Sequence, residues 1–237
     1  MEAGASNCTL TCADYYTSVD SRVDLRFSIA VGFTATAVLR QSGKVVVFGD
    51  GEYGMLADGA STNVIGDDST EMGNNLASVD LGVGMTAVRV CGGARANHAC
   101  AILSDGSIKC WGRNGDGQLG QDNSDNVGDD VGEMGNLQPI NLGVGRTAIA
   151  CATAAYHTCV LLDQGDVKCF GSGGYGVLGQ GDEIEIGSNA GDMAALGVID
   201  LGTGATAIAV VVGTYHSCAL LDDGRVKCWG YSSESSL

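Results

Sequence analysis

Residues 98–112 read HACAILSDGSIKCWG, and nearly the same stretch returns twice further along the chain. It reads HTCVLLDQGDVKCFG at 157–171 and HSCALLDDGRVKCWG at 216–230. A degenerate copy, ATAVLRQSGKVVVFG, occupies 35–49. The closing glycines of the four copies are 63, 59 and 59 residues apart, so the chain is built of internal repeats.

Each copy alternates apolar and polar residues on both sides of a turn, which is the pattern of a β-hairpin. In the copy at 98–112 the turn is a three-residue loop that ends at Gly106, where a positive φ is needed. Alternating runs at 87–91 and 78–81 predict two more short strands before the hairpin. Four short strands per unit and no convincing helix are typical of a β-propeller blade. We therefore expect an all-β fold of antiparallel four-stranded blades.

The repeat continues past the hairpin into a glycine-rich turn, GRNGDGQLGQ at 112–121. Hairpin and turn together resemble the repeats of the regulator of chromosome condensation 1 (RCC1) family, over roughly residues 30–237. The resemblance implies a seven-bladed propeller. The matching residues in this copy are His98, Gly106, Trp111, Gly112, Asn114, Gly117, Gln118, Leu119 and Gly120.

Four hairpins are too few for seven blades, which would need more than about 400 residues at this period. We therefore expect a fragment, a partial propeller that partners complete, or a small atypical ring. The RCC1-like repeat domain is assigned to 27–237. An N-terminal segment at 1–26 is expected to hold a degenerate blade strand.

The hairpin register places two cysteines of each copy directly opposite each other, close enough for a disulfide after small adjustments. The degenerate copy lacks both, with Ala37 and Val47 at those positions, as expected of partners. Cross-strand disulfides are therefore predicted, and reduced, buried thiols are the alternative. The predicted pairs are Cys100 with Cys110, Cys159 with Cys169, and Cys218 with Cys228.

The remaining cysteines lie outside the hairpins. Cys91 and Cys151 precede two of them, and the last copy has Val210 nearby, which favours small buried residues over a disulfide. Cys8 and Cys12 are expected to pair with each other or with another segment. Disulfides would indicate an oxidising compartment, either secreted or an organelle lumen, and a glycosylation sequon at Asn7 fits this.

Three histidines recur once per copy, at His98, His157 and His216. A catalytic residue rarely recurs in every repeat, so we expect each ring to bond the backbone of a neighbouring blade. A zinc site is disfavoured because no fourth ligand recurs beside the histidine and two cysteines of each copy. No nucleophile–base arrangement, P-loop or dinucleotide motif is present, which argues against an enzyme.

The acidic loops between hairpins raise a second possibility. They offer several carboxylates on a glycine-rich backbone, which is the kind of oxygen-rich loop that calcium can use. A solvated acidic face is the alternative. The candidate calcium ligands are Asp67, Asp68 and Glu71 in one loop and Asp129, Asp130 and Glu133 in the next.

Charge limits the classes of partner. The net charge of −16 argues against nucleic acid and against an anionic membrane surface, and no apolar run reaches 18 residues. We expect a non-enzymatic protein-interaction or scaffold module without a cofactor. Its partner would be a basic protein or a larger complex, and another chain could complete the ring. The alternatives are guanine nucleotide exchange on a small GTPase, which the resemblance implies, and a secreted calcium- or glycan-binding propeller.

Overall fold

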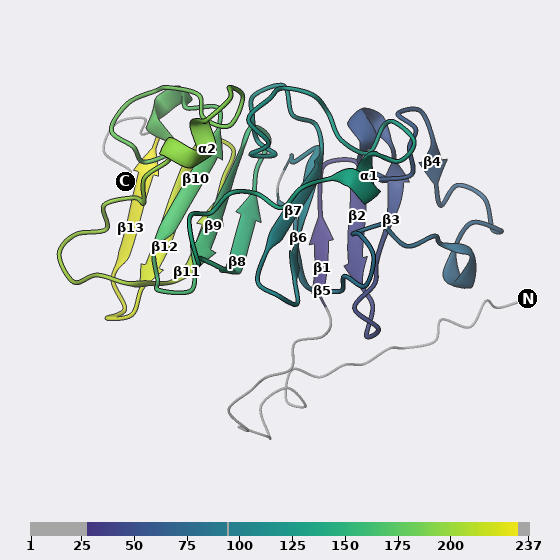
Figure 1. Ribbon diagram of the computed structural model, residues 1–237, viewed down its shortest axis with the longest axis horizontal. Helices are drawn as coiled ribbons and strands as arrows, with labels where there is room; N and C mark the ends of the chain where they lie inside the picture. The colour runs from purple at the N-terminus through teal and green to yellow at the C-terminus, as the bar shows by residue number, and fades with distance from the viewer. Residues whose placement is uncertain (1–27, 94, 232–237) are drawn as a thin grey trace, which may run out of the picture.

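The computed structural model describes residues 28–93 and 95–231, which form four antiparallel sheets in a row (Figure 1). We call these sheets blades 1 to 4 in chain order. Blade 1 contains β1 (Ser28–Val31), β2 (Ala35–Leu39), β3 (Val45–Asp50) and β4 (Val64–Ile65); blade 2 contains β5 (Ala87–Cys91), β6 (His98–Leu103) and β7 (Ile108–Gly112); blade 3 contains β8 (Ala148–Thr153), β9 (His157–Leu162) and β10 (Val167–Gly171); blade 4 contains β11 (Ala207–Val212), β12 (His216–Leu221) and β13 (Val226–Gly230).

Helices are short and lie in the connections between blades. They are α1 (Glu133–Asn136), α2 (Asp192–Ala195) and the 3-10 turns η2 (Glu52–Gly54), η3 (Gly73–Asn75) and η4 (Gly174–Gly176). No helix among the described residues is long and apolar enough to span a membrane. The all-β fold of propeller blades is therefore confirmed, and the N-terminal segment at 1–26 lies outside the described residues.

The hairpin register is the predicted one. In blade 2, Cys100 faces Cys110 and Ile102 faces Ile108. The turn is closed by a bond from the Gly106 N–H to the Leu103 carbonyl, at 2.9 Å. Gly106 has a φ of 81°, and a Cβ there would lie 2.6 Å from Thr147 of blade 3. Glycine therefore serves both the turn and the close approach of the next blade.

The expected fourth strand at 78–81 is not a strand, so only blade 1 has four. Its fourth strand is β4, which comes from a different segment of the repeat. The segment at 78–81 makes a single ladder bond, from the Val79 N–H to the Val45 carbonyl at 2.8 Å. One residue later, the Asp80 side chain accepts the Gly82 N–H and turns the chain away. The same turn follows Ile140 and Ile199 in the later repeats, at Asn141 and Asp200.

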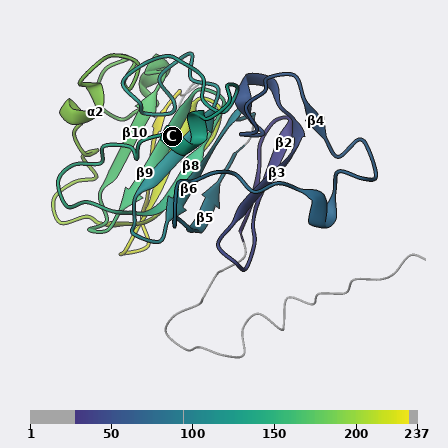
Figure 2. The same ribbon diagram turned by 45° about the vertical axis from the view of Figure 1, so that its right-hand side comes forward.

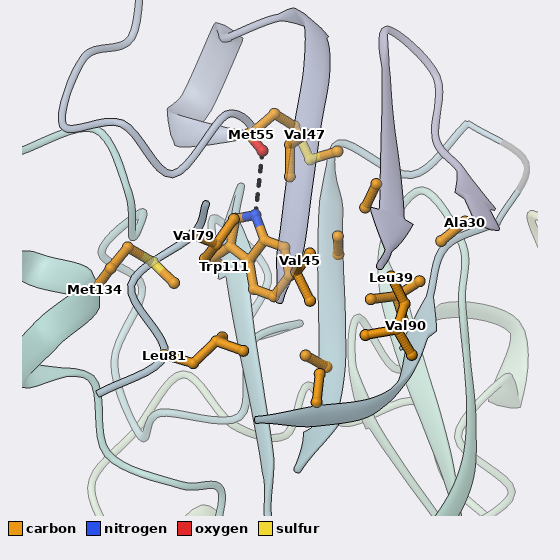
Figure 3. Packing of buried hydrophobic residues seen from close by; sticks show 14 of the residues in the cluster. Ala30, Leu39, Val45, Val47, Met55, Val79, Leu81, Val90, Trp111 and Met134 are labelled. Atoms are coloured by element: carbon orange, nitrogen blue, oxygen red, sulfur yellow. Dashed lines mark hydrogen bonds between the residues drawn. The ribbon is translucent and has the colours of Figure 1, made fainter. Parts of the chain in front are cut away.

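Apolar cores lie between the blades, and each joins one blade to the next. The first is drawn in Figure 3, where the indole of Trp111 from blade 2 lies between Val45 of blade 1 and Val79. Trp111 and its counterpart in blade 3, Phe170, are fully buried. Two further clusters join blade 2 to blade 3 and blade 3 to blade 4. Burial of apolar area between the sheets therefore holds the row of blades together.

One backbone carbonyl in each glycine-rich turn accepts a bond from the following blade. Trp111 Nε1 donates to the Met55 carbonyl at 3.1 Å, as Figure 3 shows. At the next junction the ring of Phe170 has no N–H to donate, and the Thr158 hydroxyl donates to the Gln118 carbonyl at 2.8 Å instead. At the last junction, Ser217 and Trp229 both donate to the Val177 carbonyl. The two tryptophans are thus packing residues of the junctions.

The row of blades is open. In Figure 1, blade 4 is at the left and blade 1 at the right; Figure 2 shows blade 2 between blade 1 and blade 3. The loops that contain α1 and α2 lie at the upper end in Figure 1, opposite the hairpin turns. The connections that follow blades 2 and 3 therefore place their helices on the same side of the molecule.

Candidate functional site

The histidines lie at the blade junctions, and two of them bond a hydroxyl of the next blade. His98 Nε2 is 2.7 Å from Thr158 Oγ1, and His157 Nε2 is 2.9 Å from Ser217 Oγ. Each hydroxyl gives its proton to a turn carbonyl, so it accepts from the ring, which assigns the proton to Nε2. The expected bond from the ring to the backbone of the neighbouring blade was wrong. Each ring bonds a side-chain hydroxyl of the next blade, and that hydroxyl in turn donates to a backbone carbonyl.

These two rings are neutral. Burial lowers the pKa of His98 to about 3, and it lowers that of His157 to about 4. Their Nδ1 atoms have no hydrogen-bond partner among the described residues. His216 starts the equivalent strand of blade 4 and is exposed. His98 and His157 therefore act as junction residues, whereas His216 contacts no further blade among residues 28–93 and 95–231.

The hairpin cysteines lie at disulfide-bonding distance. The pairs are Cys100–Cys110, Cys159–Cys169 and Cys218–Cys228, with Cα atoms 4.0 to 4.1 Å apart. Each pair closes its own hairpin across the ladder. Cys8, Cys12 and Asn7 lie outside the described residues.

A fourth pair corrects the expectation of small buried thiols. Cys91 of β5 bonds Cys151 of β8, with Cα atoms 5.7 Å apart. These inner strands belong to different blades and lie side by side in the row. At the junction of blades 3 and 4, Val210 stands at the ladder position of Cys151 and Ala152 at that of Cys91, so the strands approach in the same way without a disulfide. This disulfide therefore ties blade 2 to blade 3.

In the acidic loops, a glutamate that recurs between repeats accepts hydrogen bonds from the backbone of its own loop. Glu71 accepts the N–H groups of Gly66 and Asp68, and Glu133 accepts those of Gly128 and Asp130. The bonds from Gly66 and Asp68 hold the pKa of Glu71 below its usual value. Asp192 closes the third loop in the same way.

These loops do not bring the candidate calcium ligands together. Asp68 bonds the backbone and hydroxyl of Thr70, while Asp67, Asp129 and Asp130 are placed along the loop surface. Within 28–93 and 95–231, no three His, Cys, Asp or Glu side chains are grouped to hold a metal ion. The calcium hypothesis stays a prediction, and the geometry gives Glu71 and Glu133 a loop-closing role.

A cluster of tyrosines lies at the ends of blades 3 and 4 beside the turn η4. We call Tyr156, Tyr175, Tyr215 and Tyr231 the tyrosine surface. The rings of Tyr156 and Tyr215 stack with centroids 6.4 Å apart. Tyr175 meets Tyr215 and Tyr231 edge to face, at 5.6 and 4.9 Å. Tyr175, Tyr215 and Tyr231 are about half exposed, so the rings form a continuous patch that solvent reaches.

The backbone aims these rings outward. Tyr156 and Tyr215 lie in tight turns, each closed by a bond between the residues on either side, such as Ala154 N–H to the His157 carbonyl. Tyr175 has a φ of 63°, a left-handed conformation that is rare for a bulky residue. Such a conformation persists only where its surroundings hold it, and it often marks a functional surface.

Charged groups border the tyrosine surface. The Arg113 guanidinium lies over the Tyr156 ring, 5.3 Å from its centroid, and bonds Asp116 at 3.0 Å. Burial raises the pKa of Asp116. Between these groups lies a depression of about 250 Å³, which is lined by Asp116, Tyr156, His157, Ser172, Gly174, Tyr175, Val177, Thr214 and Tyr215. Its volume suits one side chain of a partner and is too small for a dinucleotide or a flavin.

The sequence held a signal for this surface that our reasoning missed. Tyr156 and Tyr215 stand at the same repeat position, directly before the histidine, where the earlier repeats have Asn97 and Thr34. Two tyrosines 59 residues apart in a propeller repeat project from neighbouring blades to one side. The spacing alone does not show that Tyr175 and Tyr231 reach the same patch.

Comparison with known proteins agrees with this architecture. The model of the regulator of chromosome condensation (RCC1) repeat matches residues 89–118, 148–177 and 207–235. The human E3 ubiquitin-protein ligase HERC2 is 29% identical over 202 residues, which are 85% of this chain and 4% of HERC2.

Solved structures show the same fold. Human WBSCR16 superposes with a TM-score of 0.64 and 19% identity, over 85% of this chain and 46% of that one. Prp20p from Saccharomyces cerevisiae, whose structure is described with its binding to Gsp1p and histones, superposes with a TM-score of 0.59 and 22% identity. The match covers 86% of this chain and 44% of that one. This chain spans less than half the length of each of these proteins.

Proposed function

We propose that this chain, which contains three matches to the RCC1 repeat, is a non-enzymatic module that binds a basic protein through the tyrosine surface. The observation that carries the proposal is the patch of exposed tyrosines around a depression of side-chain size. Tyrosine and arginine are enriched at the centres of protein interfaces, where a few such residues supply most of the binding energy.

The chemistry of the surface suits a guanidinium or ammonium group. Tyr156 already holds the guanidinium of Arg113 over its ring, within the range of a cation–π contact. Tyr175 and Tyr215 offer further ring faces and edges beside it. Asp116 adds a carboxylate at the border of the same depression. An arginine or lysine of a partner would meet both an aromatic ring and a negative charge there.

The charge of the whole chain supports a basic partner. A net charge of −16 attracts positively charged proteins and accelerates their encounter with the surface. Prp20p is described as binding histones, which are basic proteins. That protein is similar to this chain in fold, and the likeness supports a protein partner of this class.

The proposal is tested with a short fluorescein-labelled peptide of alternating arginine and glycine, followed by fluorescence anisotropy. We expect Tyr175→Ala to weaken binding by at least about tenfold, because an aromatic anchor at an interface is worth that much. Tyr53→Ala is the matched control. Tyr53 occupies the same repeat position and the same left-handed turn, with a φ of 62°, but lies in blade 1.

Two results would contradict the proposal. One is equal weakening of peptide binding by Tyr175→Ala and Tyr53→Ala, which would mean that the net negative charge, and not the tyrosine surface, attracts the peptide. The other is equal binding of a glutamate–glycine peptide, which would remove the role of positive charge. Higher salt is expected to weaken binding of the arginine peptide, because the attraction is partly electrostatic.

We also infer that the module works in an oxidising compartment. The support is that eight cysteines of the described chain lie in four bonding pairs. Disulfides persist in secreted proteins and organelle lumens and are rare in the reducing cytosol. Alkylation of the protein from its native source, unfolded without reductant, is expected to leave these eight cysteines unlabelled.

A further inference from the structure

The depression beside the tyrosine surface lies where the repeat has changed one side chain. Arg113 and Ser172 occupy the same repeat position, directly after the closing glycine of the hairpin. The Arg113 N–H bonds the Asn97 carbonyl at 2.8 Å, and the Ser172 N–H bonds the Tyr156 carbonyl at 2.9 Å. Both acceptors come directly before the histidine of their blade, so the two side chains leave the backbone at equivalent points of blades 2 and 3. A long guanidinium side chain in blade 2 is thus replaced by a short hydroxyl in blade 3.

Each of these positions has a tyrosine near it in the following blade. The Arg113 guanidinium lies over Tyr156 of blade 3, 5.3 Å from the centroid of the ring. The tyrosine at the same repeat position in blade 4 is Tyr215, and both Ser172 and Tyr215 line the depression of about 250 Å³. The depression therefore lies where the repeat would place a guanidinium over Tyr215.

Arg113 shows how this position is used when an arginine fills it. Its guanidinium has the face of an aromatic ring on one side, and one of its nitrogens lies 3.0 Å from the Asp116 carboxylate. A planar guanidinium can stack on a ring while its N–H groups reach acceptors at the edge of the same plane. The compact ammonium group of a lysine has no flat face to stack in this way. The in-chain contact therefore favours arginine as the occupant of the equivalent place.

Acceptors for such N–H groups border the depression. Asp116, which pairs with Arg113, also lines the depression, so its carboxylate lies beside both places. Ser172 and Thr214 add hydroxyl groups that can accept hydrogen bonds. The rings of Tyr175 and Tyr215 supply the apolar part of the wall. A guanidinium would thus find both a ring to stack on and polar atoms for its edge.

The charges around the depression also favour a cation. Burial raises the pKa of Asp116, the charge of Arg113 lowers it, and the nearby carboxylate of Glu185 raises it again. His157, which lines the same depression, is neutral at pH 7 because burial lowers its pKa to about 4. Two carboxylates therefore face one guanidinium in this region, and an added positive charge would balance them.

We propose that the depression is an arginine pocket, in which one arginine of the basic partner lies beside Ser172 with its guanidinium over Tyr215. The arrangement repeats that of Arg113 over Tyr156, one blade earlier. The Asp116 carboxylate accepts hydrogen bonds from the edge of the guanidinium. This inference rests on the proposed function and deepens it, because it names arginine over lysine and fixes where on the tyrosine surface the side chain lies.

Two labelled peptides of equal length and charge test the preference for arginine. They alternate arginine with glycine and lysine with glycine, and their binding is compared by fluorescence anisotropy. We expect the arginine peptide to bind at least about tenfold more tightly, because only a guanidinium can stack on the ring and donate within its plane. Addition of the same peptides to Tyr175→Ala shows whether binding occurs on the tyrosine surface at all.

A substitution that fills the pocket tests its place. Ser172→Arg should weaken binding of the arginine peptide by at least about tenfold, because a guanidinium of the chain itself then lies over Tyr215. Ser104→Arg is the matched control. It adds the same charge at an exposed residue in the hairpin turn of blade 2, at the other end of the strands. The control should weaken binding by less than about twofold, because a distant exposed charge is screened by salt. Thermal melts verify that both variants are folded.

The outcomes separate this inference from the proposed function. Equal affinity for the arginine and lysine peptides, or equal weakening by Ser172→Arg and Ser104→Arg, would overturn the arginine pocket. The tyrosine surface would still stand in that case if Tyr175→Ala reduced binding. Wild-type binding by Tyr175→Ala would overturn the proposed function and the arginine pocket together.

Discussion

The buried histidines illustrate what a single residue contributes to this fold. His98 and His157 are neutral, fully buried and bonded to one hydroxyl each. Their pKa values are about 3 and about 4 in the folded chain, against 6.5 for an unperturbed imidazole. These rings stabilise the junction at a pH at which the imidazole is neutral in both the folded and the unfolded chain, which is the case above pH 6.5.

Stability should therefore fall as the pH is lowered from about 6.5 towards 4. In this window the unfolded chain binds protons at these histidines and the folded chain does not, so the free energy of unfolding decreases. The slope is at most about 1.4 kcal/mol per pH unit for each histidine. Urea unfolding between pH 7.5 and 5 measures it.

One variant isolates the contribution of one ring. His157→Gln should reduce the slope, because it removes a buried imidazole whose pKa is lowered in the folded chain. Equal slopes in the wild type and His157→Gln would contradict this account of the buried rings.

At the residue scale, the sequence allows accurate prediction only within one hairpin. Cys100 and Cys110 could be placed opposite each other because a three-residue turn fixes the register of its own strands. The partner of His98 could not be predicted, since Thr158 is 60 residues away and meets it only after two blades have packed.

The junction between two blades is the element that can be redesigned most simply. In blade 2 an indole N–H donates to the turn carbonyl of Met55, while in blade 3 a hydroxyl donates to the turn carbonyl of Gln118. Trp111→Phe should destabilise the fold by about 1–3 kcal/mol, because it leaves the buried carbonyl without a donor and removes part of a packed ring.

Adding the hydroxyl should recover part of this loss. The double variant Trp111→Phe with Ala99→Thr copies the blade 3 arrangement of Phe170 and Thr158 into blade 2. We expect thermal unfolding to show the double variant more stable than Trp111→Phe alone. Ala99→Thr in the wild-type background should destabilise, since Ala99 is 1% exposed beside the indole. A double variant that is less stable than both singles would contradict the shared role of the two donors.

The disulfides should differ in strength according to the chain length they close. The Cys91–Cys151 bond spans 60 residues, whereas Cys159–Cys169 spans 10. By chain entropy, their loss should cost about 4 and about 3 kcal/mol respectively. Urea unfolding of Cys91→Ala/Cys151→Ala and of Cys159→Ala/Cys169→Ala measures the order, and the reverse order would contradict it.

At the element scale, the hairpins were predictable and the connections were not. The run at 78–81 alternates like a strand, but the Asp80 side chain ends its ladder after one bond. Cys91 and Cys151 looked unpaired because the lateral approach of β5 to β8 is a tertiary feature. The acidic residues Glu71 and Glu133 suggested calcium, whereas each is occupied by N–H groups of its own loop.

At the scale of the whole molecule, the repeat explains both the fold and the placement of the tyrosine surface. Equivalent positions of successive blades come to lie side by side, so Tyr156 and Tyr215 stack although 59 residues separate them. The open ends of the row follow from the same repetition, because each blade is shaped to receive a preceding blade and to pack on a following one. The propeller fold and the negative net charge could be predicted from the sequence, whereas the tyrosine surface could be identified only in the packed structure.

The central claim is that the tyrosine surface binds a positively charged segment of a protein. Hydrogen–deuterium exchange of the chain with and without the arginine–glycine peptide tests it most directly. The claim predicts slower exchange at residues 154–158, 172–177 and 213–217, which carry the tyrosine surface and its depression, and unchanged exchange at 50–57 around Tyr53. Slower exchange only in the acidic loops at 66–71 and 128–133, or no change anywhere at saturating peptide, would contradict it.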